Sequence, residues 1–301
     1  MPLISNITFN GKDSFDYFSA ALFNNSLLSE FQIYDSQQNT LRIPRVTLAG
    51  HVIPDSCEFG ATGSITLDPV NLEVCAFKVN EKICRSEVEP TYLSNRLRAG
   101  SNNEPAPQDF ANFILGELSG QIGNKMQNVL WNGNSATYSG SYLGECDGIL
   151  VQALADATVV DVSATASITT ANVAGELGRV YLAMADTVKS SGKVWKIYAA
   201  QNIVDAYIIA QGNLAYGLDS ASLKELRYAG IPLVAAPYMP AGKMFATAVD
   251  NIAIGVDLMG DMNQVSVIDT MATLGENAYR IVARWKFGVA IKVGAETVLY
   301  Y

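Results

Sequence analysis

One long helical pattern constrains this chain more than any other feature. Between Asp109, which suits an N-cap, and Gly133, which suits a stop, apolar residues recur at three- and four-residue spacing. The apolar stripe consists of Phe110, Phe113, Ile114, Leu118, Ile122, Met126, Val129 and Leu130. At 1.5 Å per residue, a helix over residues 109–131 is about 35 Å long. It is the strongest single element that the sequence predicts.

Three glycines lie in this helix away from the apolar stripe. Gly116, Gly120 and Gly123 follow i, i+4, i+7 spacing and so share one face. Each glycine in a helix interior costs about 1 kcal/mol relative to alanine. We therefore expect another segment to pack close to the helix backbone on this face. The alternative is a locally weak helix whose glycines have no function.

Residues 41–88, before the helix, have a strand-like pattern. Pro69 and Asn71 supply turn chemistry between the apolar runs 65–67 and 72–79. This pattern predicts a projecting β-hairpin. The run 72–79 has apolar residues at both odd and even positions, and so on both faces of the strand. Because a two-stranded hairpin is barely stable alone in water, its faces need a partner.

Residues 279–287, far beyond the helix, alternate strictly. One face carries Tyr279, Ile281, Ala283, Trp285 and Phe287, and the other carries Arg280, Val282, Arg284 and Lys286. The first face predicts core and the second a cationic row. Gly288 is expected to kink or bulge the strand.

The remaining segments predict an arm and an α/β region, so the fold class is α+β. Residues 1–45 show no sustained period, which predicts an extended arm with one short helix around residues 14–23; such an arm must lie on another surface. Helices and strands alternate from residue 172 onward. The predicted helices are 172–188, 201–210 and 220–228, and the strands are 194–199, 231–236, 244–248, 252–256 and 265–268.

Composition excludes several classes of protein. Of 301 residues, 49% are apolar and 16% are charged, which excludes a disordered chain. The net charge of −9 argues against a dedicated nucleic-acid reader, since phosphate binding needs a positive surface. No apolar run approaches the ~20 residues that span a bilayer, and the N-terminus lacks a signal-peptide pattern, so we expect cytoplasmic folding and no membrane partner. Few charges and much apolar surface suggest a subunit that hides this surface against copies of itself.

The four cysteines are expected to be reduced structural thiols. Cys57, Cys75, Cys84 and Cys146 have no C-x-x-C spacing and no neighbouring histidine, which argues against zinc. Pairing of Cys75 with Cys84 across a hairpin stays open.

No catalytic, cofactor-binding or metal-ligating residues are predicted. We interpret His51, the single histidine, as a solvated loop residue and not as a base for Cys57 or Cys146. Asp257 and Asp261 flank a turn and are interpreted as solvated carboxylates. The sequence has no phosphate-binding loop, dinucleotide-binding fingerprint or zinc-protease motif. We therefore expect a protein that is not an enzyme and has no cofactor.

The basic residues have three interpretations. Arg96 and Arg98, and the row Arg280, Arg284 and Lys286, could meet carboxylates of a neighbouring subunit, phosphates of DNA, or solvent alone. We favour subunit contacts over DNA, because phosphate binding without a wider basic field is weak.

The order of these parts resembles that of the major capsid proteins of tailed bacteriophages, which have the Hong Kong 97 fold. The segments that carry the resemblance are ITLDPVNLEVCAFKVNEKICRSEVEP before the long helix, QIGNKMQNVLWNG at its end, GIPLVAAPYMPAG in the middle, and DNIAIGVDL and YRIVARWKFGVAIKV near the end. Each segment is degenerate by itself, and their order over essentially the whole chain makes the likeness.

The resemblance implies a shell subunit in four parts. These are an N-terminal arm at residues 1–45, an E-loop hairpin at 46–92, a peripheral domain with a long spine helix at 93–150 and 260–287, and an axial α/β domain at 151–259 and 288–301. It also implies self-assembly through pentamers and hexamers, in the host cytoplasm, into an icosahedral virion head around double-stranded DNA. A separate scaffolding protein, portal and decoration proteins, and non-specific contact with packaged DNA complete the implied partners.

Lys78 and Lys82 lie in the region where some relatives form covalent cross-links, although no specific signal for cross-linking is present. With the glycine face and the cationic row, they are the candidate intersubunit contacts. Two alternatives remain: an encapsulin-like compartment shell, which shares the fold, and a hydrolase that uses Cys146 in GECDG.

Overall fold

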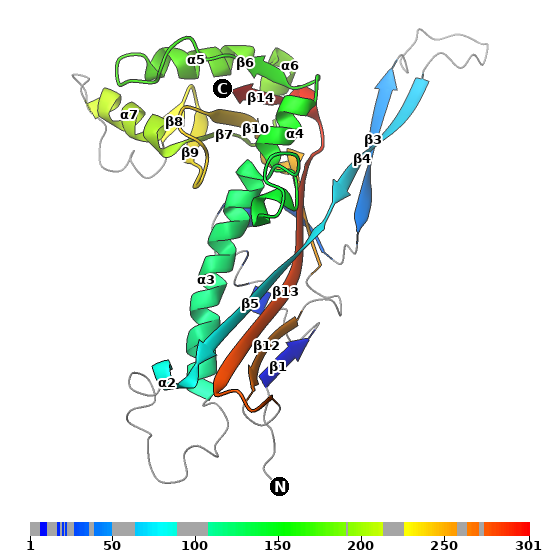
Figure 1. The fold of residues 1–301 in the computed structure, drawn as a ribbon. Helices are drawn as coiled ribbons and strands as arrows, with labels where there is room; N and C mark the ends of the chain where they lie inside the picture. Colours follow the sequence, from blue (N-terminus) through cyan, green and yellow to red (C-terminus); the bar gives the residue numbers. More distant parts are fainter. Residues whose placement is uncertain are drawn as a thin grey trace.

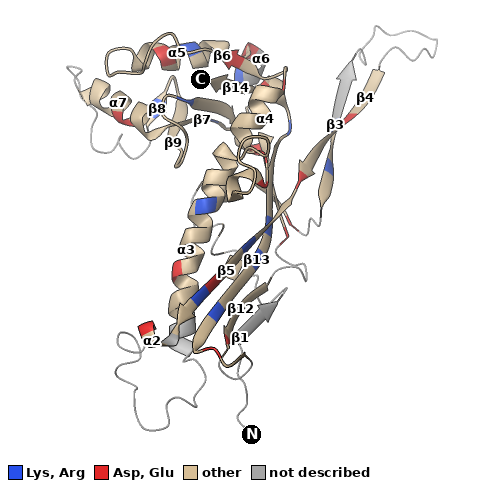
Figure 2. Cartoon of the chain, in the orientation of Figure 1, with Lys and Arg blue, Asp and Glu red and all other residues tan. Residues whose placement is uncertain are grey.

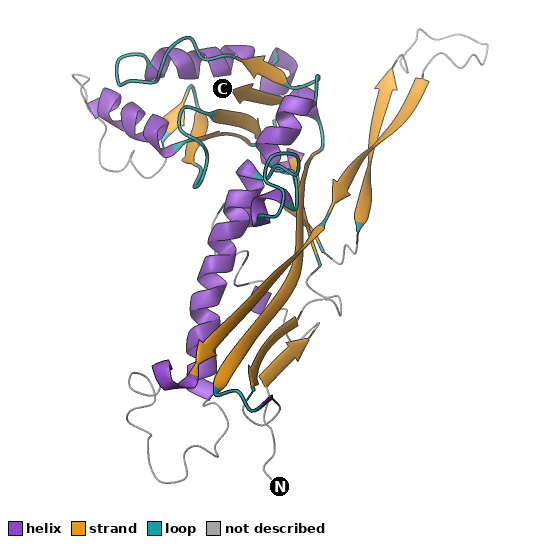
Figure 3. Ribbon diagram, in the orientation of Figure 1, coloured by secondary structure: helices purple, strands orange, loops and turns teal. Residues whose placement is uncertain are grey.

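The protein is described here by a computed structural model that covers residues 7–10, 17–18, 20, 22, 27–35, 39–49, 64–88, 108–190, 192–212, 226–257, 264–270 and 274–301. The described chain has three parts (Figures 1 and 3). A first sheet of long strands lies beside one long helix, a second sheet with several helices lies at the end of that helix, and a two-stranded ribbon projects away from both.

The first sheet is built around β13 (Ala278–Ile291). On one edge, β13 pairs antiparallel with β5 (Cys75–Cys84) over ten positions. On the other edge, it pairs with β12 (Gln264–Asp269) and then with β11 (Ile252–Val256). The sheet is completed by β1 (Ile7–Asn10) beside β12 and by β2 (Gln32–Tyr34), which is parallel to β11.

The alternation predicted for residues 279–287 is confirmed in β13. Tyr279, Ile281, Ala283, Trp285 and Phe287 are all buried, whereas Arg284 is exposed. The bulge predicted at Gly288 is wrong, because pairing with β11 continues in register through this position, and the kink stays a prediction. The glycine instead allows another strand to cross closely, as described below.

The long helix α3 (Gln108–Asn132) matches the predicted helix within one residue at each end. Its buried residues Ile122, Met126, Val129 and Leu130 belong to the main core together with residues of the first sheet. The indole Nε1 of Trp285 on β13 donates to the sulfur of Met126 at 3.4 Å. From Ile122 onward the apolar stripe therefore lies where the periodicity placed it, against the core, whereas Phe113 is 53% exposed and Leu115, outside the predicted stripe, is buried.

The second sheet has six strands. In spatial order they are β6 (Val160–Val162), β14 (Thr297–Tyr300), β10 (Met244–Ala248), β7 (Trp195–Ala199), β9 (Ile231–Ala235) and β8 (Arg227–Tyr228). The helices around it are α4 (Ile149–Ala155), α5 (Val173–Ala183), α6 (Asp186–Lys189) and α7 (Gln201–Gly212). This is the α/β region that the sequence predicted.

Two helix predictions in this region need correction. Met184 takes an extended conformation, so the helix predicted over 172–188 ends at Ala183 and is followed by the separate α6. Residues 220–225 lie outside the described residues, but Arg227 and Tyr228, at the end of the helix predicted over 220–228, form strand β8. The reason is a tight turn: Ala229 and Gly230 both have positive φ, which returns the chain so that Tyr228 pairs with Ile231.

The projecting ribbon consists of β3 (Thr40–Ala49) and β4 (Ser64–Glu73), paired antiparallel over ten positions. The turn predicted at residues 69–71 is wrong, because Pro69 lies inside β4 opposite Pro44. Both edges of a two-stranded ribbon are free, so proline removes no ladder hydrogen bond at positions that face outward. A projecting pair of strands exists as predicted, but its strands are β3 and β4 and not the runs 65–67 and 72–79, and β3 begins inside the residues assigned to the arm.

The described part of the arm lies on the chain's own core. Phe18 and Leu22 are fully buried in the short helical stretch predicted around residues 14–23, and the ring of Phe18 lies 5.8 Å from that of Trp285. Next along the chain, Phe31 contacts Tyr198 of β7, and the Glu30 carboxylate pairs with Lys196 at 2.7 Å. This part of the arm therefore joins the core shared by the two sheets.

Two strand connections pass from one sheet to the other at the same place. The chain goes from β10 through a short 3-10 turn (Val249–Asn251) into β11, and from β13 through another (Gly294–Glu296) into β14. The buried Asn251 side chain joins these connections: its Nδ2 donates to the Val293 carbonyl at 2.9 Å, and its Oδ1 accepts from the Val293 amide at 2.8 Å. The two sheets thus share a hydrogen-bonded joint.

Candidate assembly surfaces

A cationic row lies on the first sheet. The register of β5 and β13 places Lys78 directly opposite Arg284 and Lys82 directly opposite Arg280. Residues opposed in this way project from the same face, here the face away from α3, because the alternate residue Trp285 contacts α3. Lys286 lies one step along the same face, opposite Ala76. Figure 2 shows the basic positions along these two strands. The structure thus brings together five of the eight predicted site residues.

The two cross-strand pairs differ in whether a nearby carboxylate balances their positive charge. The carboxylate of Glu276 accepts from Lys82 Nζ and from Arg280 Nη2, each at 3.0 Å. Both hydrogen bonds lower the pKa of Glu276, and the bond from Lys82 has the larger effect. Lys78 and Arg284 form no ion pair within the described residues. Directly opposed like charges destabilise an antiparallel pair, so this end of the row favours an external anion.

A groove opens beside Lys78 and Arg284. It has a volume of about 570 Å³ and lies between the two strands and the segment that follows α3. Lys78, Arg284 and Lys286 line it together with Tyr142 and Glu145. The groove is therefore mixed in charge but predominantly basic.

The glycine face of α3 is partly open. A Cβ added at Gly116 or Gly120 would meet no atom within 4 Å, whereas Gly123 is buried. The predicted close-packing segment is thus not supplied by any described residue of this chain at Gly116 and Gly120. These two positions remain exposed backbone on the side of the helix away from its core contacts.

The ribbon has an inner half that packs on the sheet and an outer half that does not. Leu72 is fully buried against Ala253 and Ala290, with Leu41 and Val70 around it. On β4 farther out, Ile65 and Leu67 are 64% and 68% exposed. The outer half therefore presents apolar side chains that nothing in the described chain covers.

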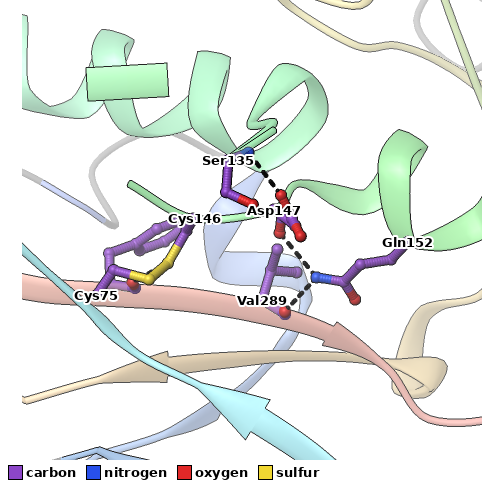
Figure 4. The surroundings of a disulfide bond; sticks show 7 residues. Cys75, Ser135, Cys146, Asp147, Gln152 and Val289 are labelled. Atoms are coloured by element: carbon purple, nitrogen blue, oxygen red, sulfur yellow. Dashed lines mark hydrogen bonds between the residues drawn. A yellow bond between two sulfur atoms is a disulfide. The ribbon is translucent and has the colours of Figure 1, made fainter. Parts of the chain in front are cut away.

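A disulfide lies where the ribbon meets the sheet (Figure 4). Cys75, the first residue of β5, is bonded to Cys146, 71 residues farther along the chain, with their Cα atoms 5.9 Å apart. The expectation of four reduced thiols is therefore wrong, as is Cys75–Cys84 pairing, since these two residues lie at opposite ends of one strand. Cys84 is exposed and free, and Cys57 lies outside the described residues.

The disulfide also contradicts the hydrolase alternative, because Cys146 is not a free thiol and is buried. His51, Asp261, Arg96 and Arg98 lie outside the described residues. Within those residues, no group of three or more His, Cys, Asp or Glu side chains is arranged to hold a metal ion. None of the helices there is long and apolar enough to cross a membrane.

Sequence reasoning missed two features of the ribbon root. The disulfide left no signal in the cysteine spacing. The second feature is a pair of glycines, Gly255 on β11 and Gly288 on β13, that lie opposite each other under Glu73 and Val74. A glycine inside each of two strand patterns was the available signal, since such glycines often mark a close approach of another backbone.

Neither a protein-family model nor a curated protein sequence matches this chain. Several solved structures are similar to this chain. The first is the procapsid of satellite phage P4 that includes the size determination (Sid) protein, with 13% identity, a TM-score of 0.64, and coverage of 95% of this chain and 89% of that chain. The second is the capsid of an empty GTA particle, with 13% identity, a TM-score of 0.60, and coverage of 91% and 88%.

The third is the virus-like particle from Pyrococcus furiosus, with 10% identity and a TM-score of 0.56. The likeness covers 96% of this chain and 100% of that chain. All three comparisons extend over nearly the whole length of both partners. At such low identity they establish the fold, and this chain has the fold of phage capsid proteins.

Proposed function

We propose that this chain is the major capsid protein of a tailed bacteriophage. Copies of it assemble through pentamers and hexamers into an icosahedral head that encloses double-stranded DNA. The observation that carries the proposal is the likeness to capsid subunits over nearly the whole chain, including 95% of its length for the P4 procapsid. Residues 1–45 would be the arm, 46–92 the E-loop, 93–150 and 260–287 the peripheral domain with α3 as spine helix, and 151–259 and 288–301 the axial domain.

The uncovered surfaces support an assembling subunit. The outer half of the ribbon exposes Ile65 and Leu67, and α3 exposes the backbone at Gly116 and Gly120. Each surface lacks a partner among the described residues and would gain one from a second copy. Contacts of this heterologous kind, repeated around a rotation axis, close into a ring.

The cationic row supports a protein partner more than a nucleic-acid partner. With a net charge of −9, the subunit carries many carboxylates that Lys78 and Arg284 of a neighbour can meet. Three or so cations without a wider positive field bind DNA weakly at physiological salt. Contact with packaged DNA is then non-specific and secondary. A scaffolding protein, a portal and decoration proteins are further partners in the proposal.

A second candidate is an encapsulin-like compartment shell. It is favoured by the likeness to the Pyrococcus furiosus virus-like particle, which covers that chain completely. The two candidates differ in content, because a phage head holds genomic DNA and a compartment shell holds cargo protein. Nuclease-protected DNA in particles isolated from the native source would support the phage head, and a protein cargo without DNA would support the compartment.

The test of shell formation is expression of the full chain, alone and with a candidate scaffolding protein. Particles are separated on a sucrose gradient and examined by negative-stain electron microscopy. We expect closed shells with fivefold and sixfold groupings of subunits. A chain that stays monomeric under both conditions and at every concentration would contradict the proposal.

A further inference from the structure

Two connections join the ribbon to the body: residues 35–39 lead from β2 into β3, and Val74 leads from β4 into β5. The backbone is extended from Ser64 to Cys84, but it changes partner at Val74: β4 pairs with β3, and β5 pairs with β13. Val74 belongs to neither strand, and its amide donates to the Asn39 carbonyl at 2.9 Å. This hydrogen bond places the two connections side by side, so backbone rotation at both together would swing the ribbon while leaving β2 and β5 in the sheet.

Non-covalent contacts at this joint are few. Leu72 packs on Ala253 and Ala290 in a small cluster that is separate from the main core. Gly255 and Gly288 add only backbone surface beneath Glu73 and Val74. The partly buried Tyr34, Leu41, Ile43 and Val70 complete this cluster, which is far smaller than the main core, so less apolar area holds the ribbon than holds the rest of the body.

The disulfide adds a covalent attachment one residue from the joint. Cys75 follows Val74 directly, and its partner Cys146 belongs to a tightly packed turn between α3 and α4. The Gly148 amide of this turn donates to the Gly133 carbonyl at 2.9 Å. Gln152 on α4 donates through Nε2 to the Val289 carbonyl at 2.8 Å (Figure 4). The bond thus ties the first residue of β5, directly beside the joint, to the segment between α3 and α4.

We propose that Cys75 and Cys146 form a redox-operated clamp that sets the angle of the ribbon. The proposal rests on the proposed function, in which the ribbon reaches a neighbouring subunit. As dithiols, in a reducing cytoplasm, they leave the ribbon free to pivot at its two connections while subunits associate. Closure in an oxidising medium then holds the ribbon in one direction, after its contacts have formed.

The oxidant is a small-molecule disulfide such as oxidised glutathione. A Cys75 thiolate, the more exposed of the two, attacks this disulfide, forms a mixed disulfide and releases one glutathione thiol. Cys146 then loses its proton and displaces the second glutathione. Two electrons pass from the cysteine pair to the glutathione disulfide, and the Cys75–Cys146 bond is the only new bond that remains.

The chain carries its own control in Cys84. This thiol is free and exposed at the far end of the same strand, away from the ribbon joint. It should react with alkylating reagents in every redox state, whereas Cys75 and Cys146 should react only when reduced. Cys84→Ser removes a thiol without touching the clamp, so it is the matched control for Cys75→Ala with Cys146→Ala.

The first test uses the full chain, purified under reductant and equilibrated with reduced or oxidised glutathione. Alkylation mapped by mass spectrometry reports the thiols, and hydrogen exchange at residues 70–76 reports the joint. We expect oxidation to protect Cys75 and Cys146 and to slow exchange at the joint about tenfold or more. The double variant should exchange like the reduced protein in both buffers, and Cys84→Ser like the unaltered chain. Free thiols at every glutathione ratio, or equal exchange in both states, would overturn the clamp.

The second test uses assembled shells. Oxidised shells should withstand higher urea than reduced shells, and double-variant shells should behave as the reduced ones do in either buffer. Equal resistance would overturn the role of the clamp in the shell. Should no shells form in any redox state, the proposed function fails, while alkylation and exchange on the isolated chain still decide whether the clamp exists.

Discussion

Gly255 and Gly288 lie directly opposite each other on β11 and β13, and the root of the projecting ribbon crosses both. A Cβ on Gly288 would overlap the carbonyl oxygen of Glu73 and would lie 3.0 Å from the Cα of Val74. A Cβ on Gly255 would lie 2.6 Å from a methyl carbon of Val74. The paired glycines therefore let one backbone pass over another at a distance that side chains would forbid.

The first prediction concerns this crossing. Gly288→Ala should lower the free energy of unfolding by about 1–3 kcal/mol, because the overlapping atoms are backbone and cannot rotate away. Urea unfolding of the full chain measures the loss. Gly175→Ala in α5 is the matched control: its added Cβ meets nothing within 4 Å, so stability should stay the same or rise. Equal stability of the Gly288→Ala variant and the unaltered chain would show that the ribbon is not seated as described.

A second prediction separates folding from assembly on α3. Gly120→Ala should raise the stability of the isolated chain by up to about 1 kcal/mol, since a Cβ there is unobstructed. Gly120→Leu should also leave the monomer folded but should block shell formation, because a large side chain fills the surface proposed for a neighbour. Circular dichroism checks the fold and electron microscopy counts particles. Normal particles from the Gly120→Leu variant would refute a close contact at this helix face.

Charge reversal in the cationic row provides a third prediction. Arg284→Glu replaces a like-charge pair with Lys78 by an opposite-charge pair, so the isolated chain should gain about 0.2–1 kcal/mol. Shell yield should nevertheless fall, because the proposed carboxylate partner on a neighbour would be repelled. Lys189→Glu, on helix α6 beside the second sheet, is the control, because it changes the net charge by the same amount as Arg284→Glu. Undiminished shell yield with Arg284→Glu would place the row outside the subunit contacts.

The fourth prediction is a pH dependence at the buried carboxylate of Glu176 on α5. Burial alone would raise its pKa, but hydrogen bonds from Thr165, Tyr300 and Arg179 outweigh burial and hold the pKa below 4.5. A pKa that is lower in the folded chain adds stability above the unfolded value, and this stability is lost as the pH falls through the folded value.

Glu176→Gln should therefore cost about 1–3 kcal/mol of unfolding free energy at pH 7, where the carboxylate accepts charge-assisted hydrogen bonds. The deficit should shrink progressively below pH 4.5, as the carboxyl group of the unaltered chain becomes protonated. Urea midpoints at several pH values measure it. A difference between the two proteins that is independent of pH would show that Glu176 acts by packing and not by charge.

Periodicity predicted the framework of this fold because it reports local burial. The 3.6-residue spacing located α3 within one residue at each end, and strict alternation located the inner and outer faces of β13. That alternation also identified the cationic row, although only the register with β5 shows that Lys78 opposes Arg284. Which strands become neighbours depends on long-range pairing, which local spacing does not contain.

The features that sequence reasoning missed all arise between distant segments. Pro69 and Asn71 have turn chemistry. In a two-stranded ribbon, however, a proline whose nitrogen faces the free edge removes no hydrogen bond between the strands, so β4 continues through Pro69. The partner of Cys75 is 71 residues away on another element, beyond the reach of spacing rules. Gly288 was recognised as unusual, but the strand that crosses it lies more than 200 residues earlier.

The Asn251 joint decides where this subunit can deform. Two covalent crossings, tied together by hydrogen bonds to both the carbonyl and the amide of Val293, connect the two sheets at one place. A shell built from one kind of chain must bend more sharply at some positions than at others. In the proposed shell, this joint would resist rotation between the two sheets, so variation in curvature would fall to the ribbon and to the glycine-lined side of α3, which are the surfaces where neighbouring copies would meet.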